Sequence, residues 1–209
     1  MSDQHISQET ERIHRIYDRA AARYDRSESW ERRLYGADAR ELVREAHGET
    51  LEIAVGTGRN LQLYSPSVRL TGIELSDEML EQARRRAADL GLDASLLQGD
   101  AQQLPFPDAS FDTVVCTFAL CTIPDDRRAV AEARRVLRPG GTLVLVEHVR
   151  SPNPFVQLIE RIGDPLMRRI AGDHLLRDPL DYLADSGFAI ERVERSRLGL
   201  LESIEARAI

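Results

Sequence analysis

Apolar and polar positions along this chain of 209 residues alternate between two periods, one typical of buried strands and one of amphipathic helices. Residues 111–120 and 142–149 are apolar through most of their length, as expected for parallel strands covered on both faces. The segments between such runs repeat apolar residues every three or four positions. The expected strands are residues 51–56, 69–75, 94–98, 111–120, 142–149, 190–197 and 201–208.

The helical segments separate these strands and carry recognisable ends. Ser76 can cap one helix and Gly91 can end it, while Pro139-Gly140-Gly141 is expected to stop the helix before the fifth strand. The expected helices are residues 6–24, 30–46, 59–65, 77–90, 124–136, 155–170 with an interruption at Pro165, and 180–184.

Alternating strands and helices with short connections predict an α/β fold with a doubly wound, mostly parallel sheet of seven strands. The last two strands are close in sequence, which favours an antiparallel C-terminal hairpin.

Composition narrows the classes of function. The net charge of -7 argues against a general nucleic-acid binder, and no apolar run approaches the roughly 20 residues that span a bilayer. The polar N-terminus lacks the apolar core of a secretion signal. Cys116 and Cys121 are expected to be reduced packing residues of a cytoplasmic protein, and a metal would need more ligands, so we predict no metal site.

The most informative segment is residues 50–60, where an apolar strand ends in Gly56-Thr57-Gly58. Glycine lacks Cβ and tolerates a positive φ, so the backbone can turn tightly and approach a ligand. Glu74 closes the next apolar strand, where a carboxylate can accept hydrogen bonds from a ribose diol. This pair predicts a nucleoside-containing cofactor at the carboxyl ends of neighbouring strands.

Five segments in order resemble the class I S-adenosylmethionine-dependent methyltransferases, in the branch of the ubiquinone and menaquinone C-methyltransferases. The resemblance covers nearly the whole chain, and Ala54 stands where the family usually has its first glycine; alanine is expected to fit there if it keeps an extended conformation. The C-terminal part is similar to bacterial phospholipid N-methyltransferases and small-thiol methyltransferases. The segments are YDRAAARYDR, LEIAVGTGRN, GIELSDEMLEQAR, GDAQQLPFPDASFD and RRVLRPGGTLVL.

The resemblance implies a single domain, 1–209, that binds S-adenosyl-L-methionine and releases S-adenosyl-L-homocysteine. Its parts are N-terminal lid helices (1–48), a cofactor-binding core (49–150), an acceptor cap (151–180) and a C-terminal helix with the hairpin (181–209). The cofactor-binding residues that it implies are Tyr17, Gly56, Thr57, Gly58, Asn60, Glu74, Leu75, Met79, Asp100, Ala101, Gln102, Thr117 and Phe118.

For the acceptor side, the resemblance implies that Tyr24 closes over the acceptor. His148 and His174 are candidate bases because an unshifted imidazole titrates near neutrality, and structural roles for both remain open. An apolar stripe edged by arginines, Phe155 to Ile170, can form a greasy acceptor pocket or rest on anionic lipid. We expect instead an amphipathic cap packed on its own sheet.

The sequence thus predicts methyl transfer to a small apolar or amphipathic acceptor. The alternatives are phosphatidylethanolamine N-methylation at the inner membrane face, small-thiol S-methylation, an NAD(P)-dependent oxidoreductase and a non-catalytic binding module. The dinucleotide pattern wants glycine at Ala54 and Arg59, which disfavours the oxidoreductase. We expect a small-molecule or lipid acceptor, no nucleic acid and no obligate protein partner.

Overall fold

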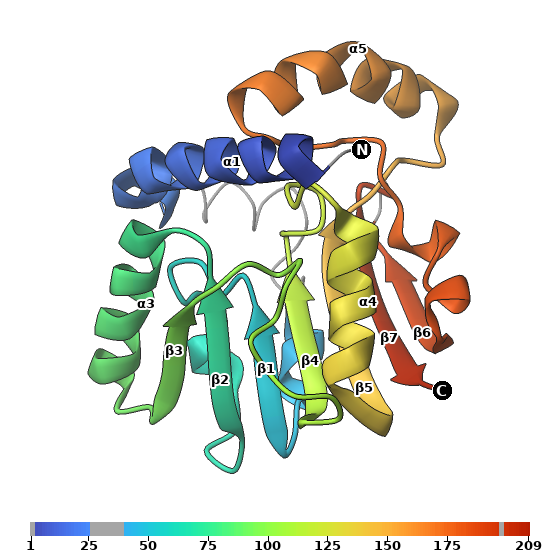
Figure 1. Cartoon of the computed structure of the whole chain (residues 1–209). Coiled ribbons are helices and arrows are strands. Elements are labelled where there is room, and N and C mark those ends of the chain that lie inside the picture. Colours follow the sequence, from blue (N-terminus) through green and yellow to red (C-terminus); the bar gives the residue numbers. More distant parts are fainter. Residues whose placement is uncertain (1–2, 26–39, 197–198) are drawn as a thin grey trace.

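The computed structural model describes residues 3–25, 40–196 and 199–209. Its seven strands form one sheet in the order β3-β2-β1-β4-β5-β7-β6, and β7 alone runs antiparallel to its neighbours β5 and β6 (Figure 1). The strands are β1 (Glu49–Ile53), β2 (Arg69–Glu74), β3 (Ala94–Gln98), β4 (Phe111–Thr117), β5 (Leu137–His148), β6 (Phe188–Arg195) and β7 (Leu201–Ala208). The predicted fold class and antiparallel hairpin are confirmed.

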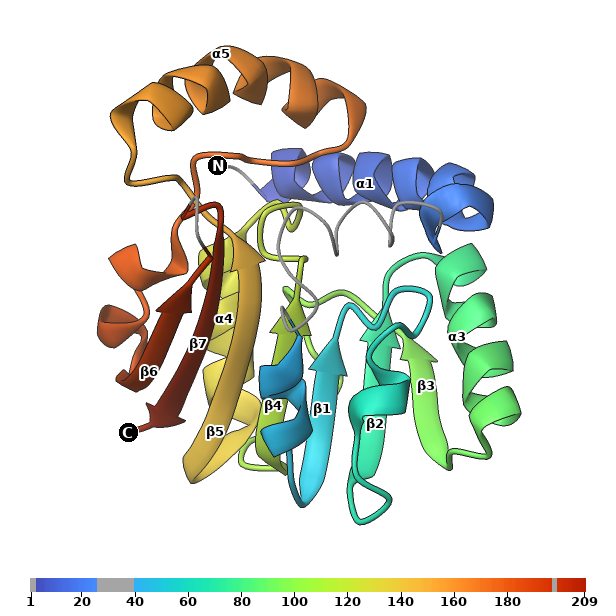
Figure 2. The ribbon, with the colours of Figure 1, turned by 180° about the vertical axis from the view of Figure 1, so that it is seen from behind.

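Helices cover both faces of this sheet and one of its ends. The front face carries α4, and the rear face carries two short 3-10 helices (Figures 1 and 2). Helix α1 lies across the end toward which the parallel strands point, and α5 lies beyond it. The α-helices are α1 (Asp3–Tyr24), α3 (Asp77–Leu90), α4 (Asp126–Val136) and α5 (Pro154–Ile170). The 3-10 helices are η2 (Glu41–Glu45), η3 (Leu61–Leu63), η4 (Pro179–Asp181) and η5 (Ala184–Ser186).

Two apolar clusters hold the layers together. One packs α4 and the segment with Tyr182 and Leu183 against the front of the sheet, including side chains of the C-terminal hairpin, and the other packs α3, η2 and η3 on the rear. Helix α3 shows how its sequence specifies its ends: Ser76 Oγ accepts from the Met79 N–H, and Gly91 adopts a left-handed φ of 64° at the C-cap. Both caps are as predicted.

Several predicted boundaries are wrong. The helix before β5 ends at Val136, and Pro139-Gly140-Gly141 lies inside the strand that follows directly. Pro165 does not interrupt α5, which is continuous. The segments near Arg59 and Leu180 form short 3-10 helices in place of α-helices, since each leaves room for only one turn. Of the predicted helix 30–46, residues 30–39 lie outside the described residues and 41–45 form η2.

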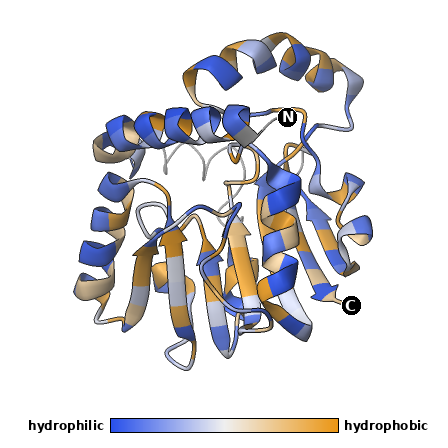
Figure 3. Cartoon of the chain, viewed as in Figure 1, coloured by the Kyte–Doolittle hydropathy of each residue, from blue (hydrophilic) through white to orange (hydrophobic). Residues whose placement is uncertain are grey.

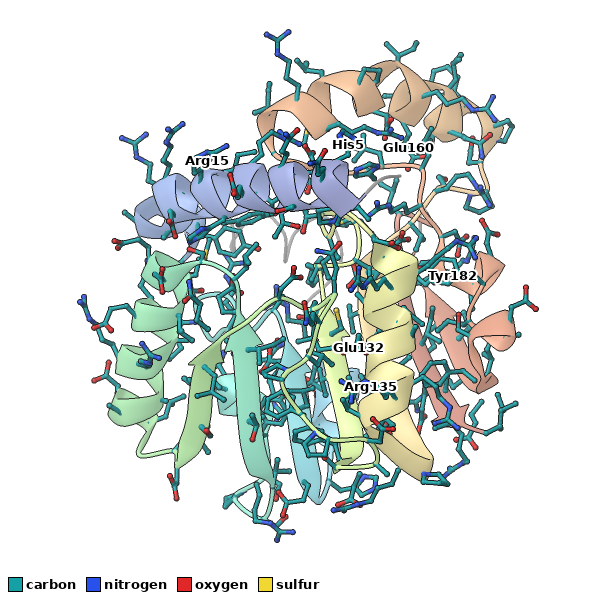
Figure 4. The ribbon with its side chains drawn as sticks, viewed as in Figure 1. His5, Arg15, Glu132, Arg135, Glu160 and Tyr182 are labelled. Carbon is teal, nitrogen blue, oxygen red and sulfur yellow. The ribbon has the colours of Figure 1, made fainter. Side chains whose placement is uncertain are left out.

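Helix α5 is turned opposite to our expectation. Its buried residues are the acids Glu160 and Asp164, whereas Phe155 is 72% exposed and Ile162 74% exposed. Figure 4 shows Glu160 on the side of α5 nearer to the rest of the molecule. The acids are buried because each accepts a backbone N–H from a flanking segment, from Ser151 and Leu175 respectively. The stripe is therefore not packed on the sheet, and the expected packed cap is wrong. Within the described residues, no helix is long and apolar enough to cross a membrane.

Candidate functional site

The loop after β1 forms the predicted glycine turn. Gly56 has a φ of 57° and Gly58 a φ of 80°, both in the left-handed region that glycine tolerates. A Cβ at Gly58 would lie 2.7 Å from the Leu61 side chain and 3.2 Å from the Ala83 backbone, so this glycine permits close packing against α3. Ala54 has a φ of 55°, so it does not have the extended conformation on which the expected fit of an alanine depended.

Glu74 lies at the end of β2 directly beside this turn. Its side chain is 7% exposed and accepts hydrogen bonds from the N–H groups of Gly56 and Ser76, both at 2.9 Å. Burial raises the pKa of the Glu74 carboxyl, while these backbone hydrogen bonds favour its charged form. A carboxylate has about four acceptor positions, so Glu74 retains acceptor capacity toward a ligand.

Asp100 follows β3 on the neighbouring loop, and α4 holds that loop in place. The Asp100 carboxylate accepts from the Gln102 backbone N–H at 2.9 Å and from its side-chain amide at 3.0 Å. Glu132 accepts the Leu104 N–H at 2.8 Å, and Arg135 donates to the Leu104 carbonyl at 3.0 Å. Figure 4 shows both side chains projecting from α4 toward this loop.

These elements enclose a pocket of about 730 Å³ at the carboxyl ends of the first three parallel strands. Most of the predicted cofactor residues line it, together with Tyr24. They are Tyr17, Gly56, Glu74, Leu75, Met79, Asp100, Ala101, Gln102, Thr117 and Phe118. We call this space the carboxylate pocket.

Thr57, Gly58 and Asn60 are not among the lining residues, and the structure gives Thr57 and Asn60 other contacts. The Thr57 hydroxyl donates to Asp25 at 2.6 Å, which ties the turn to the end of α1. The Asn60 amide donates to buried Glu52 at 2.8 Å and to Thr117 at 2.9 Å. These residues position the turn and the β4 end rather than contact the pocket.

Helix α1 covers the carboxylate pocket and is fastened at several points. Asp18 accepts from the Ser76 hydroxyl at 2.6 Å and lies 3.2 Å from His14. The Gln102 amide donates to Thr10 at 3.1 Å. Arg59 donates to the Tyr24 carbonyl at 2.6 Å, and its guanidinium lies 4.6 Å from the centre of the Tyr24 ring. The helix therefore covers the pocket and is held by polar contacts to the start of α3 and to the loops that follow β1 and β3.

A second pocket, of about 890 Å³, adjoins the first between α1, β5 and the end of α5. Tyr17, Tyr24 and Phe118 line both pockets. We call it the apolar pocket because most of its walls are apolar or aromatic. Its other lining residues are Ile16, Ala20, Cys121, His148, Ile170, Ala171 and Asp173.

The two candidate bases are placed differently. His148 lines the apolar pocket, with its ring centre 5.0 Å from that of Phe118 in an edge contact. His174 lines neither described pocket, and its backbone N–H donates to the Cys121 carbonyl at 2.8 Å. Burial, aided by Arg177 and Arg168, lowers the pKa of His174 to about 4, which makes it a weak base.

Sequence reasoning missed Asp173 as a site residue and named only its neighbour. Asp173 lines the apolar pocket, and burial raises the pKa of its carboxyl to about 6. No strand end marks it, because it sits in the loop after α5. The only available signal was an acid next to a candidate histidine in the cap segment. Within the described residues, no group of three histidine, cysteine or acidic side chains has a metal-binding arrangement.

Comparison with known proteins identifies the family. The methyltransferase domain family matches residues 51–145. A phosphatidylethanolamine N-methyltransferase of Cereibacter sphaeroides is 42% identical over 70% of this chain and 67% of its own length. A ubiquinone/menaquinone biosynthesis C-methyltransferase of Paracoccus denitrificans is 33% identical over 83% of this chain and 74% of its own. The chain belongs to the class I S-adenosylmethionine-dependent methyltransferases. This membership decides against the NAD(P)-dependent oxidoreductase.

A solved structure gives the same fold. It is an S-adenosylmethionine-dependent methyltransferase of Thermotoga maritima that superposes with a TM-score of 0.72 over 94% of this chain and all of its own, at 23% identity. The family implies S-adenosylmethionine as the methyl donor. The carboxylate pocket fits such a nucleoside, because Glu74 keeps acceptor positions and a Cβ built at Gly56 would meet only its own loop, at 4.0 Å.

Proposed function

We propose that this enzyme transfers a methyl group from S-adenosylmethionine to a small apolar or amphipathic acceptor. The observation that carries the proposal is the pair of adjoining pockets, one with Glu74 and Asp100 and the other mostly apolar, which share Tyr17, Tyr24 and Phe118. A nucleoside needs hydrogen-bond acceptors such as the two carboxylates of the first pocket. An apolar acceptor needs the apolar walls of the second pocket.

The residues of the carboxylate pocket divide the work of holding the donor. Glu74 would accept from the ribose hydroxyls, and Asp100 from the adenine amino group. At Gly56 the main chain would lie close to the methionine part of the donor, because no side chain intervenes there. The donor supplies an electrophilic methyl group on a sulfonium. The protein then has to place the acceptor and exclude water, a role that suits Tyr17 and Tyr24 of α1. Of the two candidate histidines, only His148 lines the apolar pocket, where it would meet an acceptor that must lose a proton.

Calorimetric titration with S-adenosylhomocysteine tests the donor site. We expect micromolar binding by the wild type and a loss of roughly tenfold to a hundredfold in Glu74→Gln, because a charged acceptor of hydrogen bonds is lost. Glu78→Gln is the matched control, since Glu78 is exposed on α3. Absence of binding at millimolar ligand would contradict the proposal.

Phosphatidylethanolamine N-methylation at a membrane surface is the second candidate, and α5 favours it. The exposed residues Phe155, Leu158, Ile159, Ile162 and Leu166 form an outward apolar face, which we call the α5 face, and exposed Ile170 continues it to the rim of the apolar pocket. Arg161 and Arg169 are exposed beside it, while both acids of the helix are buried. Figure 3 shows hydrophobic residues along α5, well away from the sheet. An apolar face edged by arginines suits anionic lipid. This candidate implies a cytoplasmic enzyme at the inner membrane face.

Co-sedimentation with vesicles tests this candidate. Wild-type protein should pellet with vesicles that contain phosphatidylglycerol, and should methylate phosphatidylethanolamine in them. The double change Phe155→Ser with Ile162→Ser should weaken sedimentation severalfold and leave S-adenosylhomocysteine binding unchanged. Leu90→Ser with Leu97→Ser, which alters two exposed apolar residues elsewhere, is the control. Full sedimentation by the α5 variant would count against this role of α5. Small-thiol S-methylation remains a third acceptor chemistry.

A further inference from the structure

The loop after α5 places an acidic side chain in the wall of the apolar pocket. Asp173 shares that pocket with Ile170, Ala171, Cys121 and Tyr17. In the part of the chain that the structure describes, its carboxylate makes no hydrogen bond and no ion pair. Burial alone accounts for the raised pKa of its carboxyl, about 6. No neighbouring cation or hydrogen-bond donor therefore offsets the loss of hydration of the charged carboxylate.

The other buried carboxylates near the site are all paired. Glu74 accepts two backbone N–H groups, Glu147 accepts those of Ala119 and Leu120, and Asp164 accepts from the Leu175 N–H and forms an ion pair with Arg168. Removing a charged carboxylate from water without a partner costs several kcal/mol in principle. Asp173 is partly buried, so it carries part of this cost where a ligand could relieve it, in a pocket next to the proposed donor site.

We propose that Asp173 selects acceptors whose reacting atom is an amine nitrogen attached to an apolar chain. This inference rests on the proposed function and names the acceptor class of the same site. The apolar walls would take the chain, and the carboxylate would take the ammonium group. The three shared aromatic residues would then place the nitrogen between the two pockets.

The charge balance of the reaction favours an amine here. The ammonium passes one proton to the Asp173 carboxylate, and the freed lone pair on nitrogen forms the new N–C bond. The S–C bond of the donor breaks, and the sulfur keeps that electron pair and becomes neutral. The positive charge therefore moves onto the acceptor nitrogen, and the Asp173 carboxylate pairs with it again once its proton has left to solvent. A thiolate or phenolate acceptor would instead meet a like charge in a poorly solvated pocket.

Equilibrium binding tests this selectivity without turnover. Protein saturated with S-adenosylhomocysteine is titrated with octylamine and with octanol, which share one apolar chain. We expect octylamine to bind roughly 30-fold more tightly, the size of one hydrogen-bonded charge pair. Equal affinities, or tighter binding of octanol, would overturn the inference. Failure of S-adenosylhomocysteine to bind would instead overturn the proposed function.

Variants locate the effect. Asp173→Asn should abolish the preference for octylamine with S-adenosylhomocysteine affinity unchanged, and Asp173→Glu should retain part of it. Asp185→Asn is the control, because Asp185 is exposed on η5. With the methyl donor present, mass spectrometry should detect N-methyloctylamine from the wild type at a higher kcat/KM than the S-methyl product of octanethiol. Preferential methylation of the thiol, or a preference for octylamine that is retained in Asp173→Asn, would contradict the proposed role of Asp173.

Discussion

Ala54 has the left-handed backbone conformation that the glycine usual at this position in the family would adopt without strain. It stands where the family usually has glycine, yet its φ of 55° is left-handed, which costs an alanine about 1–2 kcal/mol. Its sequence neighbours predicted the turn correctly. They did not predict the angle, because an apolar residue at a strand end looks like the continuation of the strand.

Ala54→Gly should therefore be neutral or stabilising by up to about 1 kcal/mol, since relief of the left-handed strain offsets the added flexibility and the lost methyl. The same change at Ala88, on the exposed face of α3, should destabilise by about 1 kcal/mol. Urea unfolding of both variants measures the difference. A loss of 1 kcal/mol or more in Ala54→Gly would contradict the strain argument.

Glu147 should make stability depend on pH. It is fully buried at the end of β5, and burial raises the pKa of its carboxyl to about 7. The folded state thus holds a proton that the unfolded state loses near 4.5, so this contribution is present below pH 4.5 and is lost as pH rises through 7. Relative to Glu147→Gln, the wild type should lose about 1.4 kcal/mol per pH unit across this window. Urea unfolding at pH 5 and pH 8 measures this, and parallel pH profiles would refute it.

At the scale of elements, strands and capped helices were largely predictable, whereas the direction an amphipathic helix faces was not. Residues 94–98 were predicted with the observed bounds, and Ser76 and Gly91 cap α3 as expected. For α5, periodicity grouped the apolar residues correctly but could not show that Glu160 and Asp164 find backbone donors on the inner side. Those partners come from segments whose position only the tertiary structure fixes.

The same limit applies to the site. Glu74 ends β2 and Asp100 follows β3, where parallel topology brings side chains together, so sequence could place them. Asp173 lies on a loop that no local pattern directs toward β5 and α1. Asn60 illustrates the reverse case, since it lies in the turn motif but donates to Glu52 and Thr117.

The attachment of α1 to the glycine turn is a testable element-scale feature. Asp25 accepts from Thr57 and from Arg59 at 3.1 Å, and it also pairs with Arg86. Asp25→Asn should weaken S-adenosylhomocysteine binding severalfold and cost about 1 kcal/mol of stability, because these charge-assisted bonds are partly exposed. Hydrogen exchange should accelerate at the C-terminal end of α1. Asp89→Asn, on the exposed face of α3, is the control, and unchanged exchange would contradict the attachment.

For the whole molecule, the two apolar clusters pack on opposite faces of one sheet, so binding at the strand ends should stabilise the entire domain. S-adenosylhomocysteine at 100 times its Kd should add about 2.7 kcal/mol, or roughly 5–10 °C in Tm for a domain of this size. Differential scanning fluorimetry measures the shift. Glu74→Gln should show a much smaller shift at the same concentration, and an equal shift would place the ligand elsewhere.

Tyr17, Tyr24 and Phe118 line both pockets and separate one from the other. The two tyrosine rings lie 6.2 Å apart in an edge contact. A ligand bound in one pocket fixes the positions of these aromatic rings, which also contact a ligand in the other pocket. Thermodynamic reciprocity then requires that each ligand change the affinity of the other by the same factor. One titration adds the acceptor to protein saturated with S-adenosylhomocysteine, and the other adds the two ligands in the reverse order. We expect each ligand to increase the affinity of the other by the same factor.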